Sequence, residues 1–285
     1  MKKLREKIKQ NQFVTTIEIE PPKSGSSDSE IARIQKLAKL IDGVNIPDNP
    51  MANMRMSPIS LGSIIQSKLD LEVIFHFACR DRNILSIQSE LLGANALGVK
   101  NILTLTGDKP DIGDHKDATG VFDIDSIGLT QVVSKLNNGF DFSGNKLEEK
   151  TDFFIGGVVN PCSDDLEKEL DKFHQKIERG VNFFQTQPVF DIEKLEKFTK
   201  KVEHIDIPIL YGLMPLKSVK FANYLNKNVP GIDIPQNLID RLEKGGKQET
   251  LNILKETYSN IKGMSKGIHI FPMKDYDLTL ELLQG

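Results

Sequence analysis

Short runs rich in Val, Ile, Phe and Thr alternate with helical patterns along all 285 residues, and this alternation constrains the fold more than any other feature. Several runs are continuously apolar in their first half, which is typical of strands buried on both faces. Strands are predicted at 13–20, 43–48, 72–79, 101–108, 153–160, 182–189, 208–215 and 267–273. Helices are predicted at 27–41, 57–68, 83–97, 124–137, 165–179, 192–203, 216–227 and 247–262.

Eight strand–helix units over this length match the ~250 residues typical of a (β/α)8 barrel. An open doubly wound sheet is the alternative, but it usually carries a Gly-rich phosphate loop after its first strand. Here the first strand ends in EPPK (20–23), and no G-x-G-x-x-G follows it. We therefore predict an α/β protein, a (β/α)8 TIM barrel that forms a single domain over residues 1–285. The turn-rich segment 228–235 is predicted to be an insertion before the last strand.

Local signals mark several ends of the predicted helices. Ser27 and Glu30 have the spacing of a capping box at the start of the helix 27–41. Gly98 and Gly180 follow the helices 83–97 and 165–179, where glycine commonly ends a helix.

Composition excludes several classes of protein. The chain is 39% hydrophobic and 27% charged, as is ordinary for a soluble globular protein, and its net charge of -3 does not indicate nucleic-acid or membrane binding. No apolar run approaches the ~20 residues that span a bilayer, and no apolar segment of a secretory signal follows the basic N-terminus. Two cysteines and five scattered histidines predict neither a disulfide framework nor a metal site. We expect a reduced, cytoplasmic protein without metal.

Polar residues gather where the predicted strands end, and in barrels of this type that end holds the active site. They are Glu18, Glu20, Asn45, Asp48, His76, Cys79, Arg80, Thr106, Asp108, Asn160, Gln185, Gln187 and Tyr211. Several have an ordinary structural explanation when taken singly; His76 is a core histidine and Cys79 a small buried hydrophobe on that interpretation. Together they suit the binding of a large polar-aromatic ligand and the transfer of one proton, and they contain no Ser-His-Asp arrangement.

Seven segments resemble the methylenetetrahydrofolate reductase family, in order along nearly the whole chain. They are IEIEPPK (17–23), FHFACRDRN (75–83), LTLTGDKP (103–110), DATGVFDIDSIGL (117–129), VVNPCSDDLEKELDKFHQKIERG (158–180), NFFQTQPVFD (182–191) and GLMPLKSVKFANYL (212–225). The motifs LTGD, TQPVFD and GLMPLKS fall at the ends of predicted strands, which makes the resemblance specific. Two segments are closest to the branch that is often fused to a homocysteine methyltransferase domain, which implies a methyltransferase partner.

The resemblance implies a barrel with FAD bound non-covalently at the C-terminal face of the strands. It implies a ping-pong reaction in which NADH or NADPH reduces the flavin and leaves. Methylenetetrahydrofolate then binds in the same place and is reduced to 5-methyltetrahydrofolate. The resemblance favours a homo-oligomer, because family members are often oligomers, and it does not choose between NADH and NADPH.

The resemblance also implies roles for single residues. Glu18 matches the family's general acid, which assists protonation of the folate nitrogen as the five-membered ring opens. Asp108 matches the aspartate beside the flavin and the pterin, and Gln187 matches the amide that contacts folate and nicotinamide. The flavin-contacting positions are Asn45, His76, Leu105, Thr106, Gly107, Asp108, Asp125, Ser126, Asn160 and Lys176, and Tyr211 is assigned to substrate binding.

Alternatives remain open on the sequence alone. A pterin-binding transferase without flavin would use the same polar residues, and a subunit that needs a partner protein would share the same motifs. Glu18 and Glu20 lie two apart on a predicted strand and so share a face. Glu20 either raises the proton affinity of Glu18 or pairs with Lys23.

Overall fold

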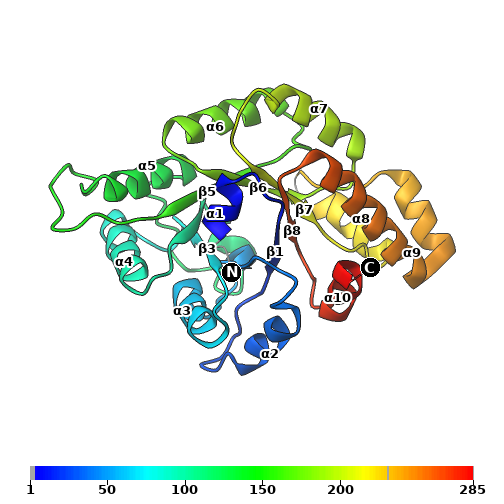
Figure 1. The fold of residues 1–285 in the computed structure, drawn as a ribbon, viewed down its shortest axis with the longest axis horizontal. Helices are drawn as coiled ribbons and strands as arrows, with labels where there is room; N and C mark the ends of the chain where they lie inside the picture. Colours follow the sequence, from blue (N-terminus) through cyan, green and yellow to red (C-terminus); the bar gives the residue numbers. More distant parts are fainter. Residues whose placement is uncertain (1–3, 230, 285) are drawn as a thin grey trace. The chain divides into compact units, whose positions relative to one another are not determined.

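The computed structural model describes residues 4–229 and 231–284. Its eight strands pair in the order β1 to β8 as a closed barrel, with helices between successive strands (Figure 1). The strands are β1 (Val14–Glu18), β2 (Gly43–Ile46), β3 (Val73–Ala78), β4 (Asn101–Leu105), β5 (Phe154–Val159), β6 (Phe183–Pro188), β7 (Ile209–Leu213) and β8 (Gly267–Ile270). The prediction of a (β/α)8 barrel is therefore confirmed.

The helices follow the predicted order. They are α1 (Leu4–Lys9), α2 (Asp28–Leu37), α3 (Pro58–Leu69), α4 (Ile84–Ala96), α5 (Ser126–Asn137), α6 (Leu166–Glu178), α7 (Ile192–Val202), α8 (Val219–Asn228), α9 (Gln236–Met264) and α10 (Tyr276–Gln284). Short 3-10 turns lie at η1 (Pro50–Ala52) and η2 (Pro110–Ile112). Gly98 and Gly180 have φ angles of 77° and 99° just after α4 and α6, as predicted for helix-ending glycines.

Two local predictions are wrong, and two helices were missed. The Ser27 side chain makes no capping bond to α2, and Glu30 instead accepts hydrogen bonds from Ser29 Oγ at 2.7 Å and Arg33 Nη1 at 3.1 Å. Helix α9 begins eleven residues before the predicted 247 and continues across a kink at Gly246, whose φ is 55° and ψ is -139°. Helices α1 and α10 were not predicted.

Chain contacts divide the molecule into two compact units. Unit 1 holds the described residues within Met1–Ile17, Val159–Asp171 and Phe183–Gly285, and unit 2 holds Glu18–Val158 and Lys172–Asn182. In unit 1, β6, β7 and β8 pair side by side and β8 pairs with β1, while α9 packs on β7 and β8. In unit 2, β2 to β5 pair in parallel, with α3 against β3 and α5 against β4. The prediction of a single domain stays a prediction.

Burial explains why these segments form parallel strands. Every residue of β2, β3, β7 and β8 is buried, as expected for strands covered on both faces. No helix within residues 4–229 and 231–284 is both long and apolar enough to cross a membrane.

Candidate active site

Glu18 is the last residue of β1, after four buried residues. Beyond it, Ile19 donates a backbone hydrogen bond of 2.9 Å to Asn45 O, so the chain continues beside β2 past the strand end. Burial, and secondly the charge of Glu20, raises the pKa of Glu18 from 4.5 to about 7, although part of the side chain still reaches solvent. A carboxyl with this pKa can donate a proton near neutral pH.

The pKa of Glu18 predicts a pH-dependent stability. A carboxyl that binds its proton more tightly in the folded chain stabilises the fold fully below pH 4.5 and loses that contribution as the pH rises through 7. The full effect is about 3 kcal/mol, an upper bound because the side chain is only half-buried.

Glu18→Gln removes this titration, so we expect the variant to gain stability relative to wild type between pH 4.5 and 7. Urea unfolding of both proteins across that window measures the difference. The exposed Glu149→Gln provides a matched control, for which the difference should stay flat. A pH-independent difference for Glu18→Gln would contradict the raised pKa.

Glu20 forms an ion pair with Arg55. Arg55 Nε donates to Glu20 Oε1 at 2.8 Å, and Arg55 Nη2 contacts the same oxygen. The pairing of Glu20 with Lys23, one of the two alternatives above, is wrong, because Lys23 pairs with Asp114. The other alternative agrees with the structure, since the charge of Glu20 contributes to the raised pKa of Glu18.

His76 and Asn45 lie together on neighbouring strands. His76 Nε2 is 3.3 Å from Asn45 Oδ1, and both side chains are buried. Burial lowers the pKa of His76 to about 3, so the imidazole is neutral at physiological pH. The pair therefore presents neutral donors and acceptors, with the His76 Nε2 proton directed to the amide oxygen in the tautomer that this contact favours.

Leu105 is the last residue of β4, and the loop Thr106 to Asp108 that follows it requires glycine at one position. Gly107 has a φ of 91°, and a Cβ there would lie 3.0 Å from Arg80 Cβ and 3.1 Å from Ala78 Cβ. The glycine thus lets the loop approach the end of β3. Asp108 is exposed; its Oδ2 accepts the Met51 N–H at 3.1 Å, and its carbonyl accepts from Arg80 Nη1 at 3.4 Å.

Asp125 and Ser126 lie at the start of α5. Asp125 Oδ1 caps the helix by accepting from the N–H groups of Ile127 at 3.0 Å and Gly128 at 2.9 Å. Ser126 N donates to Thr106 Oγ1 at 3.0 Å, which ties α5 to the loop after β4. The structure thus brings Thr106 and Ser126 together and gives Asp125 a local structural function.

Lys176 is buried on α6, with 6% of its surface exposed. Its Nζ donates to Val158 O, near the end of β5, at 2.6 Å. A buried ammonium group beside a strand end is a candidate anion ligand.

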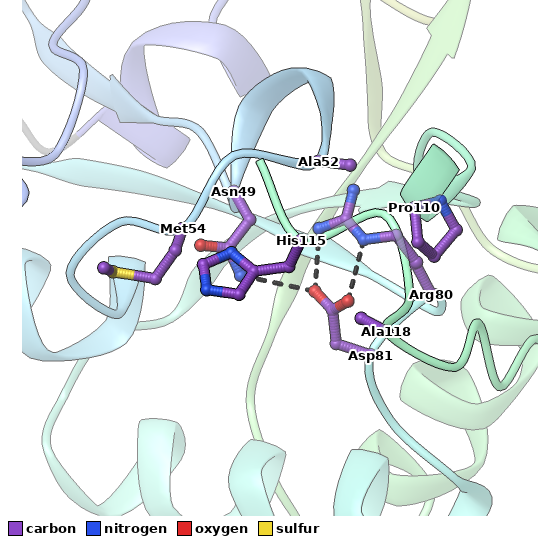
Figure 2. A pocket seen from close by; sticks show the side chains of 8 residues that line it. All are labelled: Asn49, Ala52, Met54, Arg80, Asp81, Pro110, His115 and Ala118. Carbon is purple, nitrogen blue, oxygen red and sulfur yellow. Dashed lines mark hydrogen bonds and ion pairs between the residues drawn. The ribbon is translucent and has the colours of Figure 1, made fainter. Parts of the chain in front are cut away.

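A cavity of about 200 Å³ lies among the loops that follow β2, β3 and β4 (Figure 2). Asp81 accepts from Arg80 Nε at 2.8 Å and Nη2 at 2.7 Å, and from Asn49 Nδ2 at 3.3 Å. Arg80 and Asp81 therefore form a bidentate pair on one side of the cavity.

In unit 1, Asn160 and Gln187 both lie against Gly231. A Cβ on Gly231 would lie 1.8 Å from Asn160 Nδ2 and 3.1 Å from Gln187 Oε1. Asn160 Oδ1 accepts from Cys162 N at 3.0 Å. The structure thus brings these two predicted ligand-binding amides close together.

Gln185 lies two residues before Gln187 on β6 and is 2% exposed. Among the described residues, neither its Oε1 nor its Nε2 has a hydrogen-bond partner, and the same holds for Gln187 Oε1. Buried polar groups in this state destabilise a fold unless a ligand or water satisfies them. The two amides are therefore candidates for binding a polar heterocycle.

We expect Gln185→Leu to stabilise the ligand-free protein by about 1–3 kcal/mol, because the substitution removes two buried groups without partners. Gln88→Leu is the matched control and should destabilise, since Gln88 Oε1 accepts from Phe142 N at 2.7 Å. Urea unfolding measures both. A loss of stability in Gln185→Leu would show that its amide is satisfied in solution.

Tyr211 does not lie where it was predicted. It is the middle residue of β7 rather than its end, and its hydroxyl lies 3.0 Å from Thr199 Oγ1 of α7. Alternation along the strand turns this side chain toward the helix layer. The position gives no support to the predicted substrate role.

Arg55 was missed by the sequence analysis. It lies in an irregular connection, where residue spacing does not indicate which side chains meet. Arg80, Asp48 and Gln185 appeared among the polar strand-end residues but received no role. For Gln185 a signal was available, because a glutamine at a fully buried strand position is unusual.

The fold and these residues define a (β/α)8 barrel protein with a carboxyl of raised pKa at the end of β1 and neutral polar side chains on β2 and β3. The chain belongs to the methylenetetrahydrofolate reductase family, whose profile, described as methylenetetrahydrofolate reductase, matches residues 3–284.

Individual relatives agree with this membership. A probable methylenetetrahydrofolate reductase (NADPH) of Caenorhabditis elegans is 25% identical over 246 residues, which cover 79% of this chain and 34% of the relative. Methylenetetrahydrofolate reductase 2 of Saccharomyces cerevisiae is 27% identical over 250 residues, covering 81% of this chain and 39% of the relative. The chain thus spans between a third and two fifths of the length of these relatives.

A solved structure shows the same fold. A Clostridium thermocellum protein, described as binding two copies of 5-methyl-5,6,7,8-tetrahydrofolic acid, superposes with a TM-score of 0.64 at 18% identity, covering 98% of this chain and 97% of its own. At that identity the similarity shows the fold alone.

Proposed function

We propose that this chain reduces 5,10-methylenetetrahydrofolate to 5-methyltetrahydrofolate, with NADH or NADPH as electron donor and FAD as resident cofactor. The observation that carries the proposal is Glu18, a carboxyl with a pKa of about 7 at the end of β1 in a chain of the methylenetetrahydrofolate reductase family. The relatives are named for both NADPH and NADH, so the coenzyme stays open.

The residues present fit a flavin. When bound, FAD would supply hydride transfer between the two substrates. Its ring edge carries neutral donors and acceptors, which match the neutral His76 and the amide of Asn45. Gly107 leaves room for close backbone approach, and Lys176 would offer a positive charge to the diphosphate. In unit 1, the amides of Gln185 and Gln187 have unsatisfied atoms of the kind that a heterocycle can bind.

The protein's own groups would do three things. Glu18 would donate a proton to the folate nitrogen as the five-membered ring opens. Asp108, which is exposed and held by Met51 N, would stabilise the positive charge that develops on the folate carbon. Gln187 would orient folate and nicotinamide through its amide.

Titration of the purified full chain with FAD tests the cofactor. We expect tight uptake, a yellow protein, and anaerobic bleaching by NADH or NADPH. Bleaching without reoxidation by methylenetetrahydrofolate would contradict the folate assignment.

A colourless chain that cannot take up FAD, yet binds folates in calorimetry, would support the transferase alternative. Activity that appears only after addition of cell extract would support a required partner.

A further inference from the structure

Another cavity, of about 220 Å³, lies at the starts of β7 and β8 in unit 1. Pro208 and Lys266, the residues just before these two strands, both line it. Gln187 of the candidate site lies near the end of β6, which runs parallel to β7. The cavity is therefore at the opposite end of the strands from Gln187 and is distinct from the candidate site.

Apolar side chains form a large part of the cavity lining. They come from the end of α7, the start of β7 and the end of α9, and they are Val202, Ile205, Ile207, Ile209 and Met264. An apolar cavity of about 150 Å³ can hold benzene, so this one has room for a ligand of about nine non-hydrogen atoms. Most of that ligand must be apolar to match the lining.

Tyr211 adds a buried hydroxyl group to the same lining. Its side chain is 2% exposed, and its oxygen lies 3.0 Å from Oγ1 of Thr199, which also lines the cavity. Thr199 Oγ1 donates its single proton to Leu195 O at 2.9 Å, so Tyr211 is the donor to Thr199. The tyrosine oxygen therefore keeps a lone pair that can accept a hydrogen bond from a ligand.

Three exposed charged residues, Glu203, Asp206 and Lys266, also line the cavity. In the part of the chain that the structure describes, none of these three side chains has a hydrogen bond or an ion pair. Two carboxylates and the carbonyl end of α7 favour a positively charged ligand group. Lys266 offers an ammonium group that can bind a carboxylate.

We propose that this cavity binds a small apolar α-amino acid, a function separate from the proposed folate reduction. The apolar lining would hold the side chain of the amino acid. Its ammonium group would donate to the Tyr211 oxygen and be attracted to the two acidic residues, and its carboxylate would pair with Lys266. Leucine has the size that the cavity accepts and serves as the probe.

Calorimetric titration of the full chain with L-leucine tests the site. We expect saturable binding of one leucine per chain. Two analogues of the same shape each lack one charged group: 3-methylbutylamine has no carboxylate, and 4-methylpentanoate has no ammonium group. Each should bind at least about 10-fold more weakly, because a charged group of the protein loses its partner.

Substitutions assign the two contacts. Tyr211→Phe should weaken leucine binding by about 10-fold, since it keeps the ring and removes the acceptor. Tyr224→Phe on α8, where the side chain is 50% exposed, is the matched control and should leave the affinity unchanged. Lys266→Met should weaken binding of leucine and leave binding of 3-methylbutylamine unchanged.

Three results would overturn the proposal. They are no binding of leucine at millimolar concentration, binding of either analogue as tight as that of leucine, and unchanged leucine affinity in both Tyr211→Phe and Lys266→Met. Thermal unfolding verifies that each variant is folded, and the exposed Lys266→Met carries the test if Tyr211→Phe fails to fold. Leucine binding by a chain that takes up no FAD would contradict the proposed function and leave the amino-acid site intact.

Discussion

Glu18→Gln is expected to slow reduction of methylenetetrahydrofolate by about 10²- to 10⁴-fold, the usual contribution of a positioned general acid. Reduction of bound FAD by NADH should keep its rate, because that step needs no proton from Glu18. The amide keeps the size of the side chain but cannot donate a carboxyl proton. Anaerobic rapid mixing measures the two half-reactions separately.

A matched substitution controls for nonspecific effects on the fold. Glu149→Gln changes an exposed glutamate in the same way and should leave both half-reactions unchanged. An equal fall of both half-reactions in Glu18→Gln would show that Glu18 has a structural role and that the proposed assignment is wrong.

Asp48→Ala should lower the free energy of unfolding by about 3–5 kcal/mol, the cost of leaving a buried charge without its partner. Asp48 Oδ2 accepts from Arg82 Nη1 at 2.6 Å and from Ala78 N at 2.9 Å. Both members of the ion pair are buried, and the Arg82 guanidinium lies 4.3 Å from the centre of the Phe77 ring. The substitution also leaves the Ala78 N–H at the end of β3 without an acceptor.

Urea unfolding of Asp48→Ala measures this loss, with Asp28→Ala as control. Asp28 pairs with Lys68 at 3.5 Å on the surface, where both side chains are at least half exposed, so its removal should change stability little. A similar small effect for both substitutions would show that Glu90, which also binds Arg82 at 2.9 Å, compensates for Asp48.

The barrel could be predicted because its signal is repeated along the chain. Parallel strands that are covered on both faces are apolar runs in the sequence, and each helix between them has one apolar face. Because this pattern occurs eight times, the fold could be predicted even where the bounds of single elements were wrong. The missed helix α10 had a weaker signal. Asp275 is the residue before α10, and its Oδ1 accepts a hydrogen bond from Leu278 N at 3.1 Å. An aspartate at this position is a common helix cap, so the sequence contained one signal for the start of α10.

The candidate site was only partly predictable. The positions of Glu18 and Gly107 could be predicted, because Glu18 ends β1 and Gly107 lies two residues after β4, close to the predicted strand ends. Arg55 could not, because its contact with Glu20 joins residues 35 apart through a connection with a left-handed backbone. Tyr211 was counted among the strand-end residues although it lies in the middle of the predicted strand 208–215 as well as in the middle of β7.

The most direct measurement of the central claim is a single turnover under anaerobic conditions. The full chain is loaded with FAD, reduced with one equivalent of NADH or NADPH, and mixed with methylenetetrahydrofolate. We expect the visible flavin absorbance to return while one 5-methyltetrahydrofolate forms per flavin. A reduced protein that stays bleached, or is reoxidised without forming 5-methyltetrahydrofolate, would contradict the account.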